Sequence, residues 1–430
     1  MLRSGRFRAV FAFTILFTLL APDAVRATVS WWGYGVIVGI LAIVSVALLV
    51  VERDNWSIRG LPIPLIAFLL VVVASIAWSH YPAMSLLAAL TTWATIIGAI
   101  ALAVVVSWDD LLRFLGYAVR AILGISLLFE FLVAVFVQRP VLPLWYPSNI
   151  PFDEIPTLDF WTMSLLFDGG RIQGIVSNSN LLAFIALLGV IVFGVQLADK
   201  RVRLLAGWTS MAVAVLTLAL TESVTIYAAT VAIAVVVFGV WIMRRAPTHR
   251  ARTWAFGIVA AVIAAGVSAV VVFHASIFTL LGKESDLTGR VHIWDAVISL
   301  AQERPVLGWG WISHWAPWVE PLGTLALLDG VYQLQAHNAW LDVWMQLGIV
   351  GLSAFGALAL VTIMRTLWFA IDRRRLRLES AEPFIALTVF PLLVLTVLIV
   401  QSLSESRILV EGGLLLFAVL AVKTKRRELG

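Results

Sequence analysis

Residues 84–106 read MSLLAALTTWATIIGAIALAVVV, a run of 23 residues that holds no charged side chain. A helix needs about 20 such residues to cross roughly 30 Å of hydrocarbon. Further apolar runs follow along the chain, at approximately 8–22, 30–51, 61–79, 111–137, 179–198, 204–220, 223–243, 254–273, 340–370, 383–401 and 408–422. The pattern predicts an all-α polytopic membrane protein with about 12 transmembrane helices, which form one transmembrane domain over residues 1–430.

The composition supports this fold class and excludes several kinds of chemistry. The chain of 430 residues is 61% hydrophobic and 13% charged, whereas soluble domains are nearer half apolar and a quarter charged. The sequence contains no cysteine. Its absence excludes disulfides, cysteine-based zinc or iron–sulfur centres, and a thiol nucleophile.

The first apolar run has two interpretations. Three arginines precede it and Val25-Arg26-Ala27 follows it, which is the layout of a cleavable signal peptide. Pro22 and Asp23 also suit a short loop between two membrane spans. We favour the second interpretation, an uncleaved first helix.

Basic residues indicate the orientation of the chain. With the N-terminus inside, five basic groups fall on the cytoplasmic side: Arg53 with Arg59, 200–203, 244–252, 373–377 and 423–427. Loops enriched in lysine and arginine remain cytoplasmic. We therefore attribute the net charge of +5 to orientation in the inner (plasma) membrane, with both termini cytoplasmic, and expect no nucleic-acid partner.

Two long loops, 138–178 and 274–339, are then extracytoplasmic. Loops longer than about 15 residues are usually functional or disordered, and the tryptophans and glycines of the second loop argue against disorder. Residues 290–304 predict a surface helix, lying at the membrane interface or over the bundle as a lid. Its expected apolar face comprises Val291, Trp294, Val297, Ile298 and Ala301.

The tryptophans of this region have the amphipathic side chain that favours the headgroup boundary of a membrane. We expect that location for Trp309, Trp311, Trp315, Trp318, Trp340 and Trp344.

Four arginines depart from the cytoplasmic pattern because they lie outside or at the outer mouth of a span: Arg171, Arg290, Arg304 and Arg407. Each could extend toward the headgroups or pair with a carboxylate such as Asp168, Asp286, Glu303 or Glu405. Four at one membrane face favour a second interpretation. A diphosphate requires several planar, permanently charged donors, and arginine supplies them best.

His337 ends the second loop and is followed by Asn338 at the start of a helix. Histidine exchanges a proton near neutral pH, so this residue is a candidate general base. The alternative is an interfacial residue with no chemical role. His292 and His314 lack the spacing to a third ligand, so no metal site is expected.

Polar residues at the sixth span allow two compatible interpretations. Asn178 or Ser179 can cap the helix, and a helix N-terminus beside Arg171 also attracts an anion. Three ionisable residues fall within apolar runs, namely Arg120, Glu130 and Glu411. Such groups are functional candidates by default, but the sequence assigns them no role.

An ordered set of motifs carries a family resemblance. The set is Arg171-Ile172-Gln173-Gly174 with Asn178-Ser179-Asn180, Gly289-Arg290-Val291-His292-Ile293-Trp294, Glu303-Arg304-Pro305-Val306-Leu307-Gly308-Trp309-Gly310, His337-Asn338, and Gly348-Ile349-Val350-Gly351. Over roughly residues 170–415 the chain resembles O-antigen ligases and related polysaccharide polymerases. The resemblance implies a GT-C-like, metal-independent glycosyltransferase without a cofactor. Such an enzyme moves a glycan from a polyprenyl diphosphate to a hydroxyl of a lipid or glycan acceptor, at the outer membrane face.

Carried over by position, the resemblance makes His337 the base that activates the acceptor hydroxyl. Arg171 and Arg290 would hold the diphosphate, with Arg304 and Arg407 as weaker candidates and Asn338 and Asn180 in secondary roles. One motif departs from the family, which often shows a Ser-Arg pair after the seventh span. Here that turn reads Thr221-Glu222-Ser223-Val224, without arginine, so another arginine takes that role or the donor is held differently.

Two other function classes remain open. A lipid-linked oligosaccharide transporter or flippase usually shows inverted repeats with broken helices in corresponding halves, and no such match is evident here. A membrane scaffold would leave the external arginines and His337 unexplained.

Overall fold

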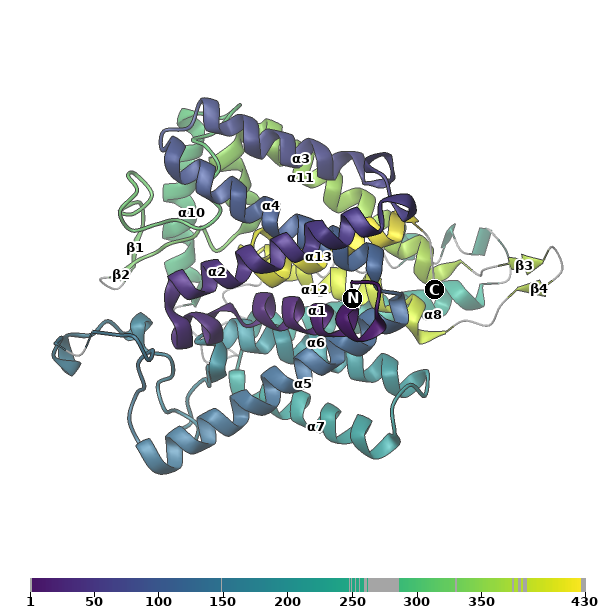
Figure 1. Ribbon diagram of the computed structural model, residues 1–430, viewed down its shortest axis with the longest axis horizontal. Coiled ribbons are helices and arrows are strands. Elements are labelled where there is room, and N and C mark those ends of the chain that lie inside the picture. Colours follow the sequence, from purple (N-terminus) through teal and green to yellow (C-terminus); the bar gives the residue numbers. More distant parts are fainter. Residues whose placement is uncertain are drawn as a thin grey trace.

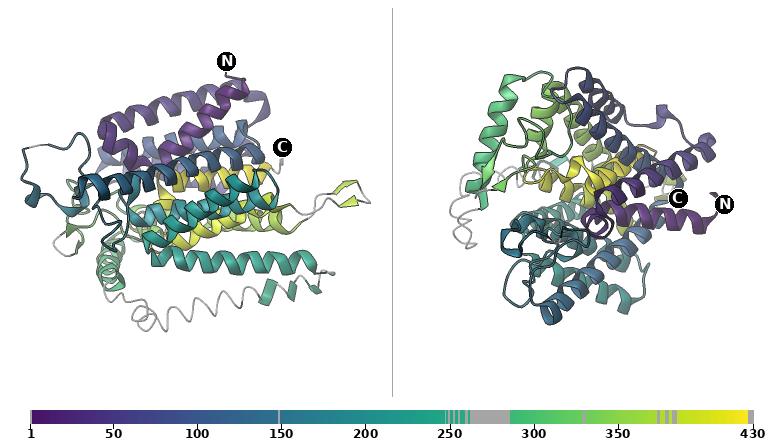
Figure 2. Two further views of the ribbon diagram at one scale, coloured as in Figure 1. Left: turned by 90° about the horizontal axis from the view of Figure 1, so that it is seen from below. Right: turned by 60° about the vertical axis from the view of Figure 1, so that its left-hand side comes forward.

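The computed structural model describes residues 2–147, 149–246, 286–328, 331–372 and 385–426, with short pieces at 248, 250–251, 253–254, 256–258, 261, 375–377 and 380–381. Most helices run along the long axis of the molecule, and α10 crosses one end of the bundle (Figure 1). The described parts of both long loops lie at that end. Both chain termini and the β3–β4 hairpin lie toward the other end (Figures 1 and 2).

The described chain is almost entirely helical outside its loops. Its α-helices are α1 (Gly5–Leu20), α2 (Pro22–Val51), α3 (Ile63–Ala74), α4 (Pro82–Val105), α5 (Trp108–Leu132), α6 (Ser179–Ala198), α7 (Leu204–Thr221), α8 (Val224–Arg245), α10 (Asp286–Glu303), α11 (Ala339–Ile371), α12 (Phe390–Ser402) and α13 (Glu411–Arg426). Two short antiparallel hairpins pair β1 (Leu327–Leu328) with β2 (Val331–Tyr332) and β3 (Arg375–Arg377) with β4 (Ser380–Ala381).

The all-α, polytopic membrane class is confirmed. Seven described helices are long and apolar enough to cross a membrane, namely α2, α4, α5 with its π-helical extension, α6, α7, α8 and α11. The apolar segments at α3 and α12 are shorter. The predicted runs coincide with helices, except that 254–273 lies mostly outside the described residues.

Helix α13 lies in the middle of the bundle (Figure 1), and residues 412–424 are all buried. It packs against α1, α4 and α11. A Cβ atom on Gly412 would meet the carbonyl of Leu19, and one on Gly413 would meet that of Arg407. The two glycines therefore allow α13 to begin in close contact with α1 and with the turn before it, as small residues do in membrane helices.

Helix α10 confirms the predicted surface helix, but its buried face is shifted. Ile293, Val297, Leu300 and Ala301 are buried, whereas Val291 is 45% exposed. The buried residues join a second apolar cluster with residues of the following loop and with Tyr81. The helix thus packs on protein, and its contacts with α11 and this loop decide which face turns inward.

The expected headgroup location is wrong for three of the tryptophans. Trp309, Trp311 and Trp315 are buried. Their indole N–H groups donate within the protein, to Leu300 O, Thr92 Oγ1 and Asp342 Oδ1 at 2.9–3.0 Å. Protein acceptors therefore replace the headgroups, whereas Trp318 remains 75% exposed.

Helix α11 is interrupted at Gly348, which has a left-handed φ of 62°. Residues 305–310 fill the interruption. Trp309 N–H and Gly310 N–H donate to the carbonyls of residues 345 and 346 at 3.0 and 2.9 Å, while residues 349 and 350 donate to the carbonyls of residues 305 and 306. Membrane helices break only where the freed backbone groups find other partners. The two glycine-containing motifs of the sequence thus form one paired structure.

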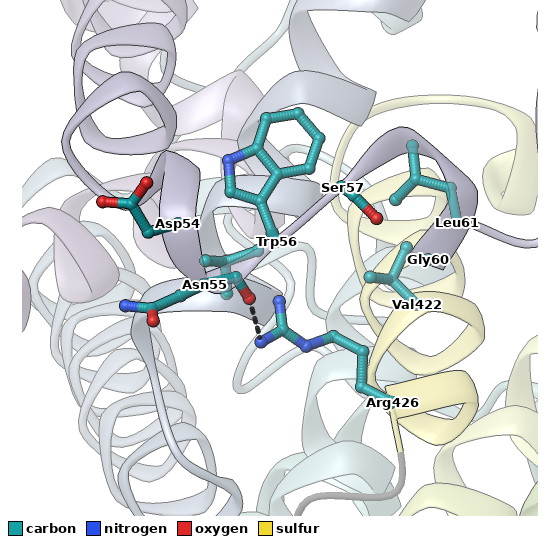
Figure 3. A pocket seen from close by; sticks show the side chains of 9 residues that line it. Asp54, Asn55, Trp56, Ser57, Gly60, Leu61, Val422 and Arg426 are labelled. Atoms are coloured by element: carbon teal, nitrogen blue, oxygen red, sulfur yellow. Dashed lines mark hydrogen bonds between the residues drawn. The ribbon is translucent and has the colours of Figure 1, made fainter.

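The end of the bundle away from α10 contains a cavity of about 380 Å³, shown in Figure 3. It lies beside the last turn of α13, where the Arg426 guanidinium donates to Asn55 O at 3.0 Å. Its lining residues are Asp54, Asn55, Trp56, Ser57, Gly60, Leu61, Val104, Val422 and Arg426. Arg171, Arg290, Arg304, Arg407 and His337 do not line this cavity.

Candidate functional site

His337 lies directly before α11 and has a left-handed φ of 48°. Its Nδ1 atom is 3.2 Å from Glu405 Oε2, and its Nε2 atom is 3.4 Å from Gln333 Oε1. Asn338 caps α11, because its Oδ1 accepts from the N–H groups of Trp340 and Leu341. The cap and the turn before it fix where the imidazole leaves the backbone.

Glu405, in the connection between α12 and α13, is the centre of the site. Its Oε1 accepts from Asn180 Nδ2 at 3.0 Å and from the Arg290 guanidinium at 3.3 Å. Its Oε2 faces His337 Nδ1 and accepts from Gln335 Nε2 at 3.3 Å. Side chains from α6, α10, the 274–339 loop and the α12–α13 connection therefore meet at one carboxylate.

The charge of Glu405 follows from these contacts. Burial by itself raises the pKa of the carboxyl, but the hydrogen bond and charge of His337 and the charges of Arg290 and Arg407 lower it to about 2. The group is therefore a carboxylate at neutral pH. From the sequence, Glu405 is predicted only as a possible partner of an arginine, and its position two residues before Arg407 is the available signal.

Arg171 reaches the same group of side chains through Asn180. Its guanidinium donates to Asn180 Oδ1 at 2.6 Å and, through Nε, to Thr221 O at 3.1 Å. Ser223 Oγ donates to the same Asn180 oxygen at 2.9 Å. The arginine thus lies at the α7–α8 turn, the place where the sequence lacks the Ser-Arg pair often expected from the family resemblance. Arg171, which lies 50 positions before Thr221, therefore supplies a guanidinium to this turn.

Glu130, to which the sequence assigns no role, holds the backbone beside Arg171. The side chain is fully buried in α5. It accepts hydrogen bonds from the N–H groups of Gln173 and Gly174 at 3.0 and 2.6 Å, and from Thr162 Oγ1 at 2.9 Å. It thereby ties two parts of the 138–178 loop, Thr162 and the turn that follows Arg171, to α5.

The remaining two arginines occupy different surroundings. Arg407 pairs with Glu411 at 3.2 Å, and the other oxygen of Glu411 contacts Arg26. Arg407 is nevertheless close enough to lower the pKa of Glu405. Arg304 lies beyond the far end of α10 from Arg290, with its guanidinium 4.3 Å from the centre of the Trp309 ring. The intervening helix spans roughly 20 Å, so the structure does not bring Arg304 to the Glu405 group.

The protein is thus a polytopic membrane protein with partly buried guanidiniums and one imidazole gathered at one end of its bundle. No three His, Asp or Glu side chains are placed to hold a metal ion in the part of the chain that the structure describes.

Comparisons with known proteins confirm the family resemblance. Residues 209–356 match the family model described as O-antigen ligase. The exopolysaccharide production protein ExoQ of Rhizobium meliloti (strain 1021) is 27% identical to this chain over 132 residues. This match covers 29% of the chain and 29% of the relative, less than a third of the relative's length. The family match includes Arg290, Arg304 and His337, whereas Arg171, Glu405 and Arg407 lie outside it.

Proposed function

We propose that this protein is a membrane glycosyltransferase of the O-antigen ligase or polysaccharide polymerase type. In this proposal it moves a glycan from a polyprenyl-diphosphate carrier to an acceptor hydroxyl at the outer face of the inner membrane. One observation carries it, namely the hydrogen-bonded group in which His337, Arg290 and Asn180 meet at Glu405 while Arg171 holds Asn180. This group combines a candidate base with donors for an anionic leaving group.

The Glu405 contact selects the imidazole tautomer. A carboxylate accepts a proton from Nδ1–H, so the lone pair of His337 is left on Nε2. In this tautomer Nε2 and Gln333 Oε1, 3.4 Å apart, are both acceptors and form no hydrogen bond, so an acceptor hydroxyl that donates to Nε2 would displace the Gln333 side chain. As its oxygen attacks the anomeric carbon, its proton moves to Nε2. The bond from that carbon to the diphosphate breaks, and the electron pair leaves with the polyprenyl diphosphate.

The arginines act on the leaving group in this mechanism. Negative charge grows on the diphosphate oxygens as the glycosidic bond breaks, and fixed donors stabilise such charge most when they are desolvated. Arg290 has a side chain that is 13% exposed, and Arg171 is part-buried. The diphosphate would take over donors that the Glu405 carboxylate and Asn180 now occupy. Arg407 adds positive charge nearby, whereas Arg304 is too distant for the same diphosphate.

The orientation of the chain is part of the proposal. In this proposal the α10 end lies outside, both termini are cytoplasmic and the chain has about 12 membrane spans; the basic loops support this orientation. Reporters fused near Thr248 and at the C-terminus should read as cytoplasmic, and a reporter near Thr324 as external. An external signal at Thr248 would refute the assigned side of the site.

The direct test uses the full chain in proteoliposomes with a synthetic polyprenyl-diphosphate glycan donor and an acceptor glycan. We expect a glycosylated acceptor and release of the polyprenyl diphosphate, both lost in the Arg290→Ala variant. Movement of a labelled donor between leaflets without transfer would instead identify a lipid-linked oligosaccharide flippase and overturn the proposal.

A further inference from the structure

We infer that Asp342 is a positioning residue that sets the separation of His337 and Glu405. This inference rests on the proposed function and adds to it a residue that need not touch either substrate. Asp342 lies in the first turn of α11, and its side chain is fully buried. No motif in the sequence indicates a role for it.

The carboxylate joins both halves of the candidate site. One oxygen, Oδ2, accepts from the N–H of Ala336, the residue before His337, at 3.2 Å. The same oxygen accepts from the hydroxyl of Ser406, the residue after Glu405. A single atom therefore holds the chain next to the imidazole and the chain next to the carboxylate that faces it.

The other oxygen of Asp342 holds an earlier part of the 274–339 loop. Oδ1 accepts from Trp315 Nε1 at 2.9 Å and from Gln346 Nε2 at 3.2 Å. The side-chain oxygen of Gln346, Oε1, in turn accepts from the backbone N–H groups of Ile312 and Ser313, both at 2.9 Å. Asp342 and Gln346, one turn apart on α11, thus hold three segments together: residues 312–315, Ala336 and Ser406.

Helix α10 also holds the backbone of Ala336, through its carbonyl group. Trp294 Nε1 donates to Ala336 O at 3.0 Å, so both backbone polar groups of Ala336 are engaged. Trp294 lies one helical turn after Arg290, on the same side of α10. The peptide before His337 is therefore fixed between the helix that carries Arg290 and the helix that carries Asp342.

The free-energy cost of burying the Asp342 carboxylate indicates that this residue has a role beyond packing. Among the described residues, no lysine, arginine or histidine forms an ion pair with Asp342 at salt-bridge distance. A buried carboxylate without a counter-ion is costly and depends on complete hydrogen bonding. A neutral side chain could fill the same volume. A carboxylate, by contrast, can accept from four donors in different segments at once.

Asp342→Asn tests the inference with little change of shape. The amide keeps one acceptor oxygen and replaces the other with an N–H₂ group, which faces donors that need an acceptor. We expect the kcat for transfer to fall by about thirty- to a hundredfold, since misplacement by about 1 Å can cost a hundredfold. The KM for the donor should change by no more than about threefold, because the arginines remain.

Ser406→Ala is the milder variant and keeps the carboxylate in place. It removes only the hydroxyl donor beside Glu405, and we expect a several-fold loss of kcat. The double variant should lose less than the product of the two single losses, because both changes break the same hydrogen bond. Thr362→Val is the matched control. It removes a buried hydroxyl of α11 that bonds only its own helix, at Leu358 O, and should leave kcat unchanged.

A distance measurement separates this inference from the proposed function. The chain has no cysteine, so cysteines introduced at Leu334 and Leu403, which are 37% and 53% exposed, carry the only two spin labels. We expect a narrow distance distribution in the wild type and in Thr362→Val, and a broader one in Asp342→Asn and Ser406→Ala.

The outcomes are distinct. Broader distances in a protein that transfers no glycan would support the positioning role and overturn the proposed function. An active protein in which both Asp342→Asn and Ser406→Ala keep the wild-type kcat and distances would overturn the positioning role. If Asp342→Asn fails to accumulate in the membrane, Ser406→Ala alone decides between these results.

Discussion

The two ends of the bundle use charge differently. At the end with the termini, the ion pairs Arg53–Asp54 and Arg113–Asp110 keep side-chain exposures of 79% and 84%, and of 54% and 41%. At the end covered by α10, Arg290 and Glu405 are only 13% and 5% exposed. Hydrated pairs contribute little to stability, whereas desolvated charges need complete networks of partners. The desolvated pair is the one expected if the α10 end serves the proposed chemistry.

Arg290 offers the strongest test of this difference. Arg290→Ala should abolish transfer while the protein remains in the membrane at a near-normal level, because it removes a partly buried guanidinium that is proposed to bind the diphosphate. Arg290→Lys should rescue activity poorly, since a point charge does not reproduce planar, bidentate donation. Initial rates in proteoliposomes measure both effects. A Lys variant as active as the wild type would show that only diffuse charge is needed.

His337→Ala should reduce turnover by about a hundredfold or more with donor binding retained, since general bases contribute 10²–10⁴. His337→Gln should be nearly as poor, because it keeps hydrogen bonding but loses the titrating nitrogen. The wild-type rate should rise with pH through the imidazole range. If His337 is only an interfacial residue, the Gln variant will be fully active and the pH profile will not change on mutation.

Because of Glu405, the free energy of unfolding of the α10 end should fall at low pH. Its folded-state pKa of about 2 lies below the ordinary value of 4.5, so the unfolded chain binds more protons between these limits. The stabilisation, on the order of a few kcal/mol, is present above about pH 4.5 and is lost as the pH falls toward 2. Thermal unfolding in detergent should show this loss in the wild type. An equal loss of thermal stability at low pH in the Glu405→Gln variant would show that another group causes it.

Arg113→Ala at the opposite end should have the smallest effect. Its partner Asp110 is one turn away on the same helix, and exposed pairs of this kind contribute about 0.3–0.5 kcal/mol. We expect unchanged transfer and a barely lower midpoint of thermal unfolding. A loss of activity comparable with that of the Arg290 variants would remove the distinction between the two ends.

The helices could be predicted from the sequence because apolar runs of membrane length have few alternative structures. The register of α10 could not, because Val291 and Ile293 are both apolar and tertiary contacts select which one is buried. The locations of Trp309, Trp311 and Trp315 depended on acceptors elsewhere in the chain. An indole can satisfy its N–H at a headgroup or inside protein, and local sequence does not distinguish the two.

The candidate site divides in the same way. His337 and Arg290 stand in motifs that can be recognised locally. The place of Arg171 beside Thr221 depends on a contact across 50 residues, so its presence at the α7–α8 turn required the fold. Glu405 and Asp342 are single carboxylates without a motif, and only the donors gathered around each one show what it does.

The interruption of α11 at Gly348 has a consequence for how the protein responds to its membrane. A continuous transmembrane helix tilts as a rigid rod when the lipid thickness changes, and any side chain at its tip moves with it. In α11, residues 305–310 instead form backbone hydrogen bonds on both sides of the interruption, with residues 345–346 and with residues 349–350. Tilting of the rest of the helix, residues 351–371, can be absorbed at this joint. The residues around Glu405 can therefore keep their geometry in bilayers of different lipid composition.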